Sequence, residues 1–115
     1  MSKSLFTIRS KKHAKHPQVI IYADRIRFKS LTLTHSRGNK RHRNKKLHTN
    51  PTPQDSRNAY LHRVAIKDFK FNYSKAFKNY HLSNEDIDEL IRFLESKKKY
   101  PYRCKHKAPT GVLLI

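Results

Sequence analysis

Three consecutive residues, Thr34, His35 and Ser36, can transfer a proton or bind an anion, and Arg37 follows them. A histidine titrates near neutral pH and can accept or donate a proton, while hydroxyls and an arginine can hold a phosphate. These groups suit cleavage of RNA through its own ribose 2′-hydroxyl, which requires a base, a cation and an acid but no metal. The alternative is that they are surface polar residues at a sheet edge.

A basic segment begins within this candidate catalytic set and continues after it. Residues 35–48 hold six Lys/Arg, three His and no acid, and such cations bind phosphates. The alternative is a solvated charge run. Beyond it, His62 would share a strand face with Tyr60, since it lies two residues further on. The residues expected to bind nucleic acid are therefore Arg37, Lys40, Arg41, Arg43, Arg57, Tyr60 and His62.

Aromatic side chains are the second means of holding nucleic acid, because unpaired bases stack on them. The other interpretation is core packing, which we favour for Phe69 and Phe71. The candidates for stacking are Tyr60, Phe71, Tyr73 and Tyr80.

The charge of the chain points to a polyanionic partner. Its 115 residues include 27 Lys/Arg and 8 Asp/Glu, which gives a formal net charge of +19. A protein this basic binds nucleic acid in a salt-dependent way. Most of the excess lies in residues 1–82, so the last third of the chain reads as packing rather than as binding surface. RNA is the expected partner and DNA the alternative.

Several classes of protein are disfavoured by what the chain contains. Residues 1–82 hold only three scattered acids (Asp24, Asp55 and Asp68), which disfavours a two-metal nuclease, and we expect neither a metal nor a cofactor. The single cysteine, Cys104, indicates a reducing compartment. No apolar run resembles a signal peptide or reaches the roughly 20 residues of a membrane span, so a cytoplasmic protein is expected.

The elements expected to position these residues are mostly strands. Leu5–Arg9 predicts a short strand, and 18–36 predicts an antiparallel hairpin that turns at 23–25. The alternation slips at Ser30–Leu31, which predicts a bulge there and a hairpin with one buried and one basic face. A long polar loop covers 36–58, held down only by Leu47. A strand is expected at 60–66. The segment 69–77, with Phe69, Phe71 and Tyr73 on one face, is either a further strand or an aromatic connector.

One helix is predicted over 84–98. Ser83 is a suitable N-cap, and acidic residues follow in the first turn. Ile87, Leu90, Ile91 and Leu94 have the spacing of a buried stripe. The predicted fold is α+β, a small antiparallel barrel-like sheet with a C-terminal helix. It forms one domain over 1–100, followed by a basic tail over 101–115.

Two segments resemble a known family. HPQVII (16–21) and FKSLTLTHS (28–36) are similar to the strands of PemK/MazF/Kid-like toxins that carry "RP-x-V-V-I" and "V-x-x-L-T-S". The resemblance implies a barrel that cleaves RNA without metal and an antitoxin that occupies the same cleft. It assigns the catalytic hydroxyl to Thr34 or Ser36. His16 stands where the family has its catalytic Arg, and the family's "G-D-V" start and Gly-rich first loop are missing.

The leading hypothesis is therefore a toxin-type, metal-independent endoribonuclease. The alternative is a non-catalytic nucleic-acid-binding accessory protein of a mobile element. A third class is a module that docks on an acidic protein. Whether the chain forms a homodimer is left open.

Overall fold

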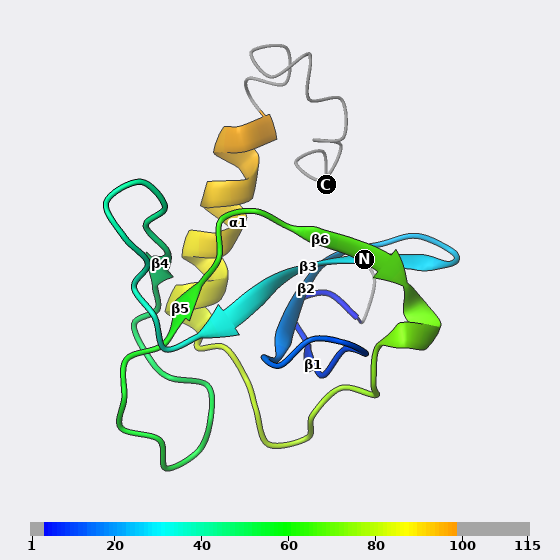
Figure 1. Ribbon diagram of the computed structural model, residues 1–115, viewed down its shortest axis with the longest axis horizontal. Coiled ribbons are helices and arrows are strands. Elements are labelled where there is room, and N and C mark those ends of the chain that lie inside the picture. Colours follow the sequence, from blue (N-terminus) through cyan, green and yellow to red (C-terminus); the bar gives the residue numbers. More distant parts are fainter. Residues whose placement is uncertain (1–3, 99–115) are drawn as a thin grey trace.

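The protein is an α+β fold with an antiparallel sheet and a C-terminal helix, as predicted (Figure 1). The computed structural model describes residues 4–98, so the predicted basic tail and Cys104 lie outside the described residues. The elements are β1 (Ile8–Arg9), β2 (Gln18–Ala23), β3 (Arg27–Thr34), β4 (Lys45–Lys46), β5 (Tyr60–Leu61), β6 (Ile66–Phe69), a 3-10 turn η1 (Lys70–Asn72) and α1 (Asn84–Lys98).

The sheet is arranged around β3. Its strand order is β1-β2-β3-β5-β4, and β6 pairs with β3 beside β5. β6 covers the first half of β3, from Arg27 to Ser30, and β5 pairs with Leu33 and Thr34 at its end. β1 and β4 end the strand order, so the sheet built by the described residues is open.

The predicted hairpin exists, but its bulge lies on the other strand. Ile20 pairs with Ser30 and Tyr22 pairs with Lys29, which leaves Ile21 as the extra residue on β2. The prediction of a bulge at Ser30–Leu31 was therefore wrong. A bulge on either strand restores the same alternation, so the side-chain pattern of one strand alone does not locate it.

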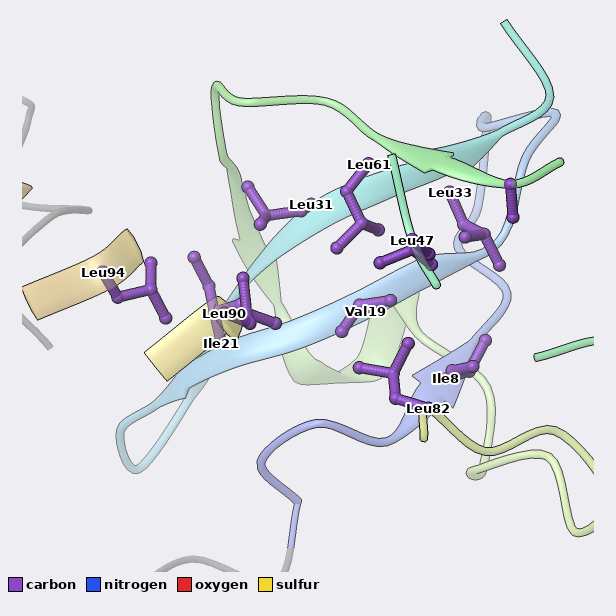
Figure 2. Packing of buried hydrophobic residues seen from close by; sticks show 11 residues of the cluster. Ile8, Val19, Ile21, Leu31, Leu33, Leu47, Leu61, Leu82, Leu90 and Leu94 are labelled. Atoms are coloured by element: carbon purple, nitrogen blue, oxygen red, sulfur yellow. The ribbon is translucent and has the colours of Figure 1, made fainter. Parts of the chain in front are cut away.

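The first face of the sheet carries the main core (Figure 2). Val19 and Ile21 of β2 and Leu31 and Leu33 of β3 pack there with side chains from the helix. Figure 1 shows α1 beside the end of the sheet that carries β4 and β5. The remaining buried members of this cluster are Ile8, Leu47, Ala59, Leu61, Leu82, Leu90 and Leu94.

The second face of the hairpin is buried as well, which corrects the prediction of a basic face. Seven of the eight residues of β3 are buried. The hydroxyl of Ser30 donates to Gln18 Oε1 (2.9 Å) and shares a hydrogen bond with the Tyr73 hydroxyl (2.9 Å). Gln18 Nε2 donates to Thr32 Oγ1 (3.1 Å). These polar side chains satisfy one another, which permits their burial.

Three strand boundaries differ from the prediction. β1 is shorter because Phe6 has a positive φ of 64°, which turns the backbone before the strand begins. The segment 60–66 is split between β5 and the start of β6. Of the two alternatives for 69–77, a strand or an aromatic connector, the strand stops at Phe69, where β6 ends and a 3-10 turn follows.

The helix has the predicted bounds, and Ser83 is its N-cap. Ser83 Oγ accepts a hydrogen bond from Asp86 N (3.1 Å) and donates one to Asp86 Oδ2 (3.0 Å). Leu90 and Leu94 are buried, and Ile87 packs against the same cluster. Within residues 4–98, no helix combines the length and apolar character needed to cross a membrane.

Candidate nucleic-acid interface

The basic segment after β3 folds into a compact hairpin rather than a solvated charge run. Gly38 and Arg43 form an antiparallel bridge, and Asn44 N donates to Arg37 O (3.0 Å). Asn39 Oδ1 closes the tip by accepting from the backbone N–H groups of Arg41 (2.9 Å) and His42 (2.8 Å). We call residues 36–44 the basic hairpin. Its backbone hydrogen bonds fix the positions of the Cα atoms from which the cationic side chains extend.

The base of the basic hairpin depends on Gly38 and Ser36. Gly38 has a φ of 84°, and a Cβ there would lie 2.0 Å from His42 O, so only glycine fits. Ser36 Oγ accepts from Gly38 N (3.1 Å), and Ser36 O accepts from Asn44 Nδ2 (2.8 Å). The Ser36 side chain therefore closes the hairpin, a role that its position in the predicted catalytic set did not suggest.

A cavity of about 430 Å³ lies between the basic hairpin and residues 62–64. Arg63 joins the two sides, because its Nε donates to Arg43 O (2.8 Å). Its guanidinium also lies 5.6 Å from the centre of the Phe93 ring of α1, which ties the cavity to the helix. We call this the hairpin cavity. It is lined by Ser36, Gly38, Asn39, Arg41, His42, Arg43, Asn44, His62, Arg63 and Val64.

The other predicted cations of this segment gather close by. Arg37, Lys40 and Arg43 line a second cavity of about 270 Å³. Within residues 4–98, no carboxylate forms an ion pair with Arg37, Lys40, Arg41 or Arg43. Four exposed cations without a carboxylate partner in the described part of the chain make this the place where an external anion is favoured.

Lys45 lies next in the chain but has a different role. Its Nζ lies 2.6 Å from Glu89 Oε1 of α1, and the imidazole of His48 bonds to the other oxygen of that carboxylate. These two contacts lower the pKa of Glu89 to about 2, and the carboxylate in turn raises the pKa of His48. The segment around β4 is thus fastened to the helix, which holds the basic hairpin in place.

His35 belongs to a separate cluster with Asp55 and Arg57. His35 Nε2 lies 2.9 Å from Asp55 Oδ2, while Arg57 Nε and its second terminal nitrogen reach the two oxygens at 3.1 and 3.2 Å. Hydrogen bonds from Arg57 and then from His35 hold the pKa of Asp55 well below its usual range. The carboxylate is therefore ionised at neutral pH, and it raises the pKa of Arg57.

Thr34 and His35 line a small cavity together with His16. Its volume is about 60 Å³, and its other lining residues are Pro17 just before β2, Leu33 of β3, and Asn50, Thr52 and Ala59 of the loop before β5. Thr34 is buried, with 8% of its surface exposed, and its Oγ1 accepts from Ser36 N (3.2 Å). The structure thus brings Thr34, His35 and His16 together, whereas Ser36 lines the hairpin cavity.

The remaining predicted binding residues divide between these places. Thr34 pairs with Tyr60 and Leu33 with Leu61, so Tyr60 and His62 share the sheet face opposite the buried Leu61. His62 lines the hairpin cavity, and Tyr60 does not. Arg57 bonds to Asp55, as His35 does, and does not line the hairpin cavity. Most of the predicted residues therefore belong either to the basic hairpin and its cavities or to the cluster around His35, and Tyr60 lines none of these cavities.

The sequence interpretation missed six residues of the hairpin cavity, namely Gly38, Asn39, His42, Asn44, Arg63 and Val64. Asn39 and Asn44 shape the hairpin, and their positions on either side of its tip match residues that favour turns. His42 belongs to the basic run already noted. Nothing in the local sequence marks Arg63, because its contacts with Arg43 and the helix are long-range.

The aromatic residues are sorted by burial. Tyr73 is buried, and its ring makes an edge-to-face contact with that of Phe28. Tyr80 is half-buried and makes the same kind of contact with Phe77 beside the core. Both rings are therefore engaged in packing. Phe69 and Phe71 are exposed, which contradicts the prediction that they pack in the core. Tyr60 is half-buried.

No group of three or more His, Cys, Asp or Glu side chains within the described residues is placed to hold a metal ion. No family model matches the chain, and neither the curated proteins nor the solved structures include one significantly similar to it.

Proposed function

We propose that this protein binds RNA through the basic hairpin and cleaves it without a metal at His35. The observation that carries the proposal is the set of four cations, Arg37, Lys40, Arg41 and Arg43, around two adjoining cavities. Phosphate groups bind best where cations have no carboxylate to neutralise them. A cavity of about 430 Å³ also has the size range of sites that hold small ligands, which suits a nucleotide unit.

The bond between Asp55 and His35 supports cleavage at the neighbouring cluster. In this proposal the ionised Asp55 accepts a hydrogen bond from His35 Nε2–H, which leaves Nδ1 as the basic nitrogen. Nδ1 then removes the proton of a ribose 2′-hydroxyl, and the 2′-oxygen attacks the adjacent phosphorus. Arg57 offers its guanidinium to the charge that develops on the phosphate.

A second histidine supplies the acid. His16 lines the same cavity as His35, and in its protonated form it gives a proton to the departing 5′-oxygen. The products are a 2′,3′-cyclic phosphate and a 5′-hydroxyl end. The resemblance to PemK/MazF/Kid-like toxins assigns the reaction to the position of His16 and to Thr34 or Ser36, and His16 and Thr34 line this one cavity. Their place in one cavity supports that resemblance, although histidine replaces arginine.

We also propose that the sheet closes into a barrel-like form. β6 pairs with the first half of β3, and the backbone after it continues to the other edge, around β1. A chain that bonds to both edges draws them together. The bonds at β1 join Lys12 N to Asn72 O (2.8 Å), Ser74 N to Ser10 O (2.9 Å) and Phe77 N to Ile8 O (2.8 Å).

The decisive experiment is cleavage of single-stranded RNA in the presence of a chelator. We expect cyclic-phosphate products from the wild type and a loss of about 100-fold or more in His35→Ala, since general acid–base groups contribute at least that much. His81→Ala, at an exposed histidine ahead of α1, is the matched control and should retain the wild-type rate. A substrate with 2′-deoxyribose at the cleaved position should bind and remain intact. Undiminished cleavage by a folded His35→Ala variant would refute the assignment.

The alternative function, a non-catalytic nucleic-acid-binding accessory protein, is favoured by one observation. The cavity beside His35 holds about 60 Å³, and Thr34 is buried, so the site must open to admit a phosphate. In that case RNA binding is retained with no turnover. Expression in cells separates the two functions: growth arrest with loss of RNA supports a cytoplasmic toxin held by an antitoxin, and normal growth supports the accessory protein.

A module that docks on an acidic protein predicts a different result. Single-stranded RNA at moderate salt would then fail to displace the acidic partner.

A further inference from the structure

Two exposed aromatic rings form a parallel pair at the far end of the sheet from the basic hairpin. The rings of Phe69 and Phe71 are 5.3 Å apart between centroids and within 5° of parallel. Phe69 is 43% exposed and Phe71 is 77% exposed. Ile26, at the adjacent β2–β3 turn, is 52% exposed and accepts a backbone hydrogen bond from Lys70 N (2.8 Å). We call Phe69 and Phe71 the aromatic pair.

The surroundings of the aromatic pair are basic. Arg27 is directly opposite Phe69 in the strand register, and its guanidinium lies 5.6 Å from the centre of that ring. Within residues 4–98, four cations of this region form no ion pair with a carboxylate. These cations are Arg25, Arg27, Lys67 and Lys70.

The two acids nearby already have partners. Asp24 Oδ1 accepts from the backbone N–H groups of Ile26 (2.9 Å) and Arg27 (2.7 Å) inside the turn. Asp68 lies 2.8 Å from Lys11 Nζ, and it also accepts from Asn72 Nδ2 (2.9 Å). The region therefore offers an apolar ring surface inside a field of positive charge.

This combination selects one kind of occupant. A second copy of the chain would bring a net charge of +19 against the same charge, which opposes self-association here. An acidic peptide would pair with the cations, but its carboxylates would not stack on the two parallel rings. A single-stranded nucleic acid satisfies both features, because its bases stack on aromatic rings while its phosphates meet Lys and Arg.

We propose that the aromatic pair binds an unpaired base of the same single-stranded nucleic acid whose phosphates the basic hairpin holds. This inference rests on the proposed RNA binding but not on cleavage. β3 connects the two places, since Arg27 begins it and Thr34 ends it just before the hairpin. Seven residue steps at ~3.3 Å place the two ends about 23 Å apart, so one strand of several nucleotides reaches both.

The test compares the binding of two single-stranded probes, an oligoadenylate and an abasic oligonucleotide of equal length that keeps its phosphates. Phe71→Ala should bind the oligoadenylate about tenfold more weakly than the wild type, which corresponds to about 1.4 kcal/mol, and should bind the abasic probe unchanged. Phe71→Tyr keeps a ring and should retain wild-type affinity, whereas Phe71→Leu keeps only apolar bulk and should resemble alanine. Because Phe71 is 77% exposed, these variants are expected to fold.

Matched variants of the hairpin separate this inference from the proposed function. Arg41→Gln with Arg43→Gln should weaken binding of both probes. If those substitutions weaken binding and Phe71→Ala does not, the aromatic pair is no base-stacking site, while RNA binding by the hairpin stands. If neither set changes binding, both proposals fail. An equal loss for both probes in Phe71→Ala, or a change of oligomeric state in that variant, would also overturn the inference.

Discussion

Asp86 offers the sharpest test of how α1 holds the segment around β4 in place. It is fully buried on α1 and accepts backbone hydrogen bonds from His48 N (2.7 Å) and Thr49 N (3.2 Å). It also accepts from the hydroxyl of Ser83, the N-cap of its own helix. One carboxylate therefore joins the start of the helix to the chain just after β4.

The expected cost of Asp86→Ala follows from these three bonds. A hydrogen bond to a charged group contributes about 1.5–3 kcal/mol. Part of this loss is recovered in the variant, because His48 and Thr49 are exposed and their N–H groups can bond to water instead. We expect the free energy of unfolding to fall by about 2–4 kcal/mol. For a domain of this size that lowers Tm by about 8–32 °C, at about 4–8 °C for each kcal/mol.

Asp88→Ala is the matched control, since Asp88 lies two residues further along the same helix and is exposed. It removes a charge near the helix N-terminus without removing these bonds, so it should cost about 0.5 kcal/mol. Thermal and urea unfolding of both variants measure the difference, and hydrogen exchange should show faster exchange at His48 and Thr49 in Asp86→Ala alone. If the two variants unfold within about 0.5 kcal/mol of each other, Asp86 does not anchor the segment as argued.

Two further predictions concern the basic hairpin and its attachment. Gly38→Ala places a Cβ against His42 O and should weaken RNA binding by distorting the hairpin while leaving the core packed, as a binding assay beside a thermal melt would show. Because the pKa of Glu89 is lowered to about 2 from 4.5, its contacts with Lys45 and His48 stabilise the protein above about pH 4.5 and are lost as pH falls toward 2. Glu89→Gln should therefore be less stable than the wild type at neutral pH, with a gap that closes in acid; a gap independent of pH would contradict this.

Local signals in the sequence determined the elements that depend on near neighbours. The helix at 84–98 and its N-cap follow from Ser83, the acidic first turn and the spacing of Leu90 and Leu94. The pairing of β2 with β3 follows from their alternating apolar residues. The net charge of +19 is likewise a property of composition alone and underlies the expectation of a polyanionic partner.

Tertiary contacts decided which residues of these elements are buried and which are exposed. Polar residues of β3 indicated an exposed face, yet Gln18, Ser30 and Tyr73 bond to one another and bury it. Phe69 and Phe71 indicated core, yet the chain enters a 3-10 turn there and leaves both rings exposed.

The candidate site shows the same division. The sequence identified His35 and the basic segment by residue type and local density. Only the fold brought Asp55 to His35 across 20 residues and Arg63 to Arg43 across another 20. Contacts between residues far apart in the chain depend on the packing of the whole sheet and helix, and no local pattern encodes them.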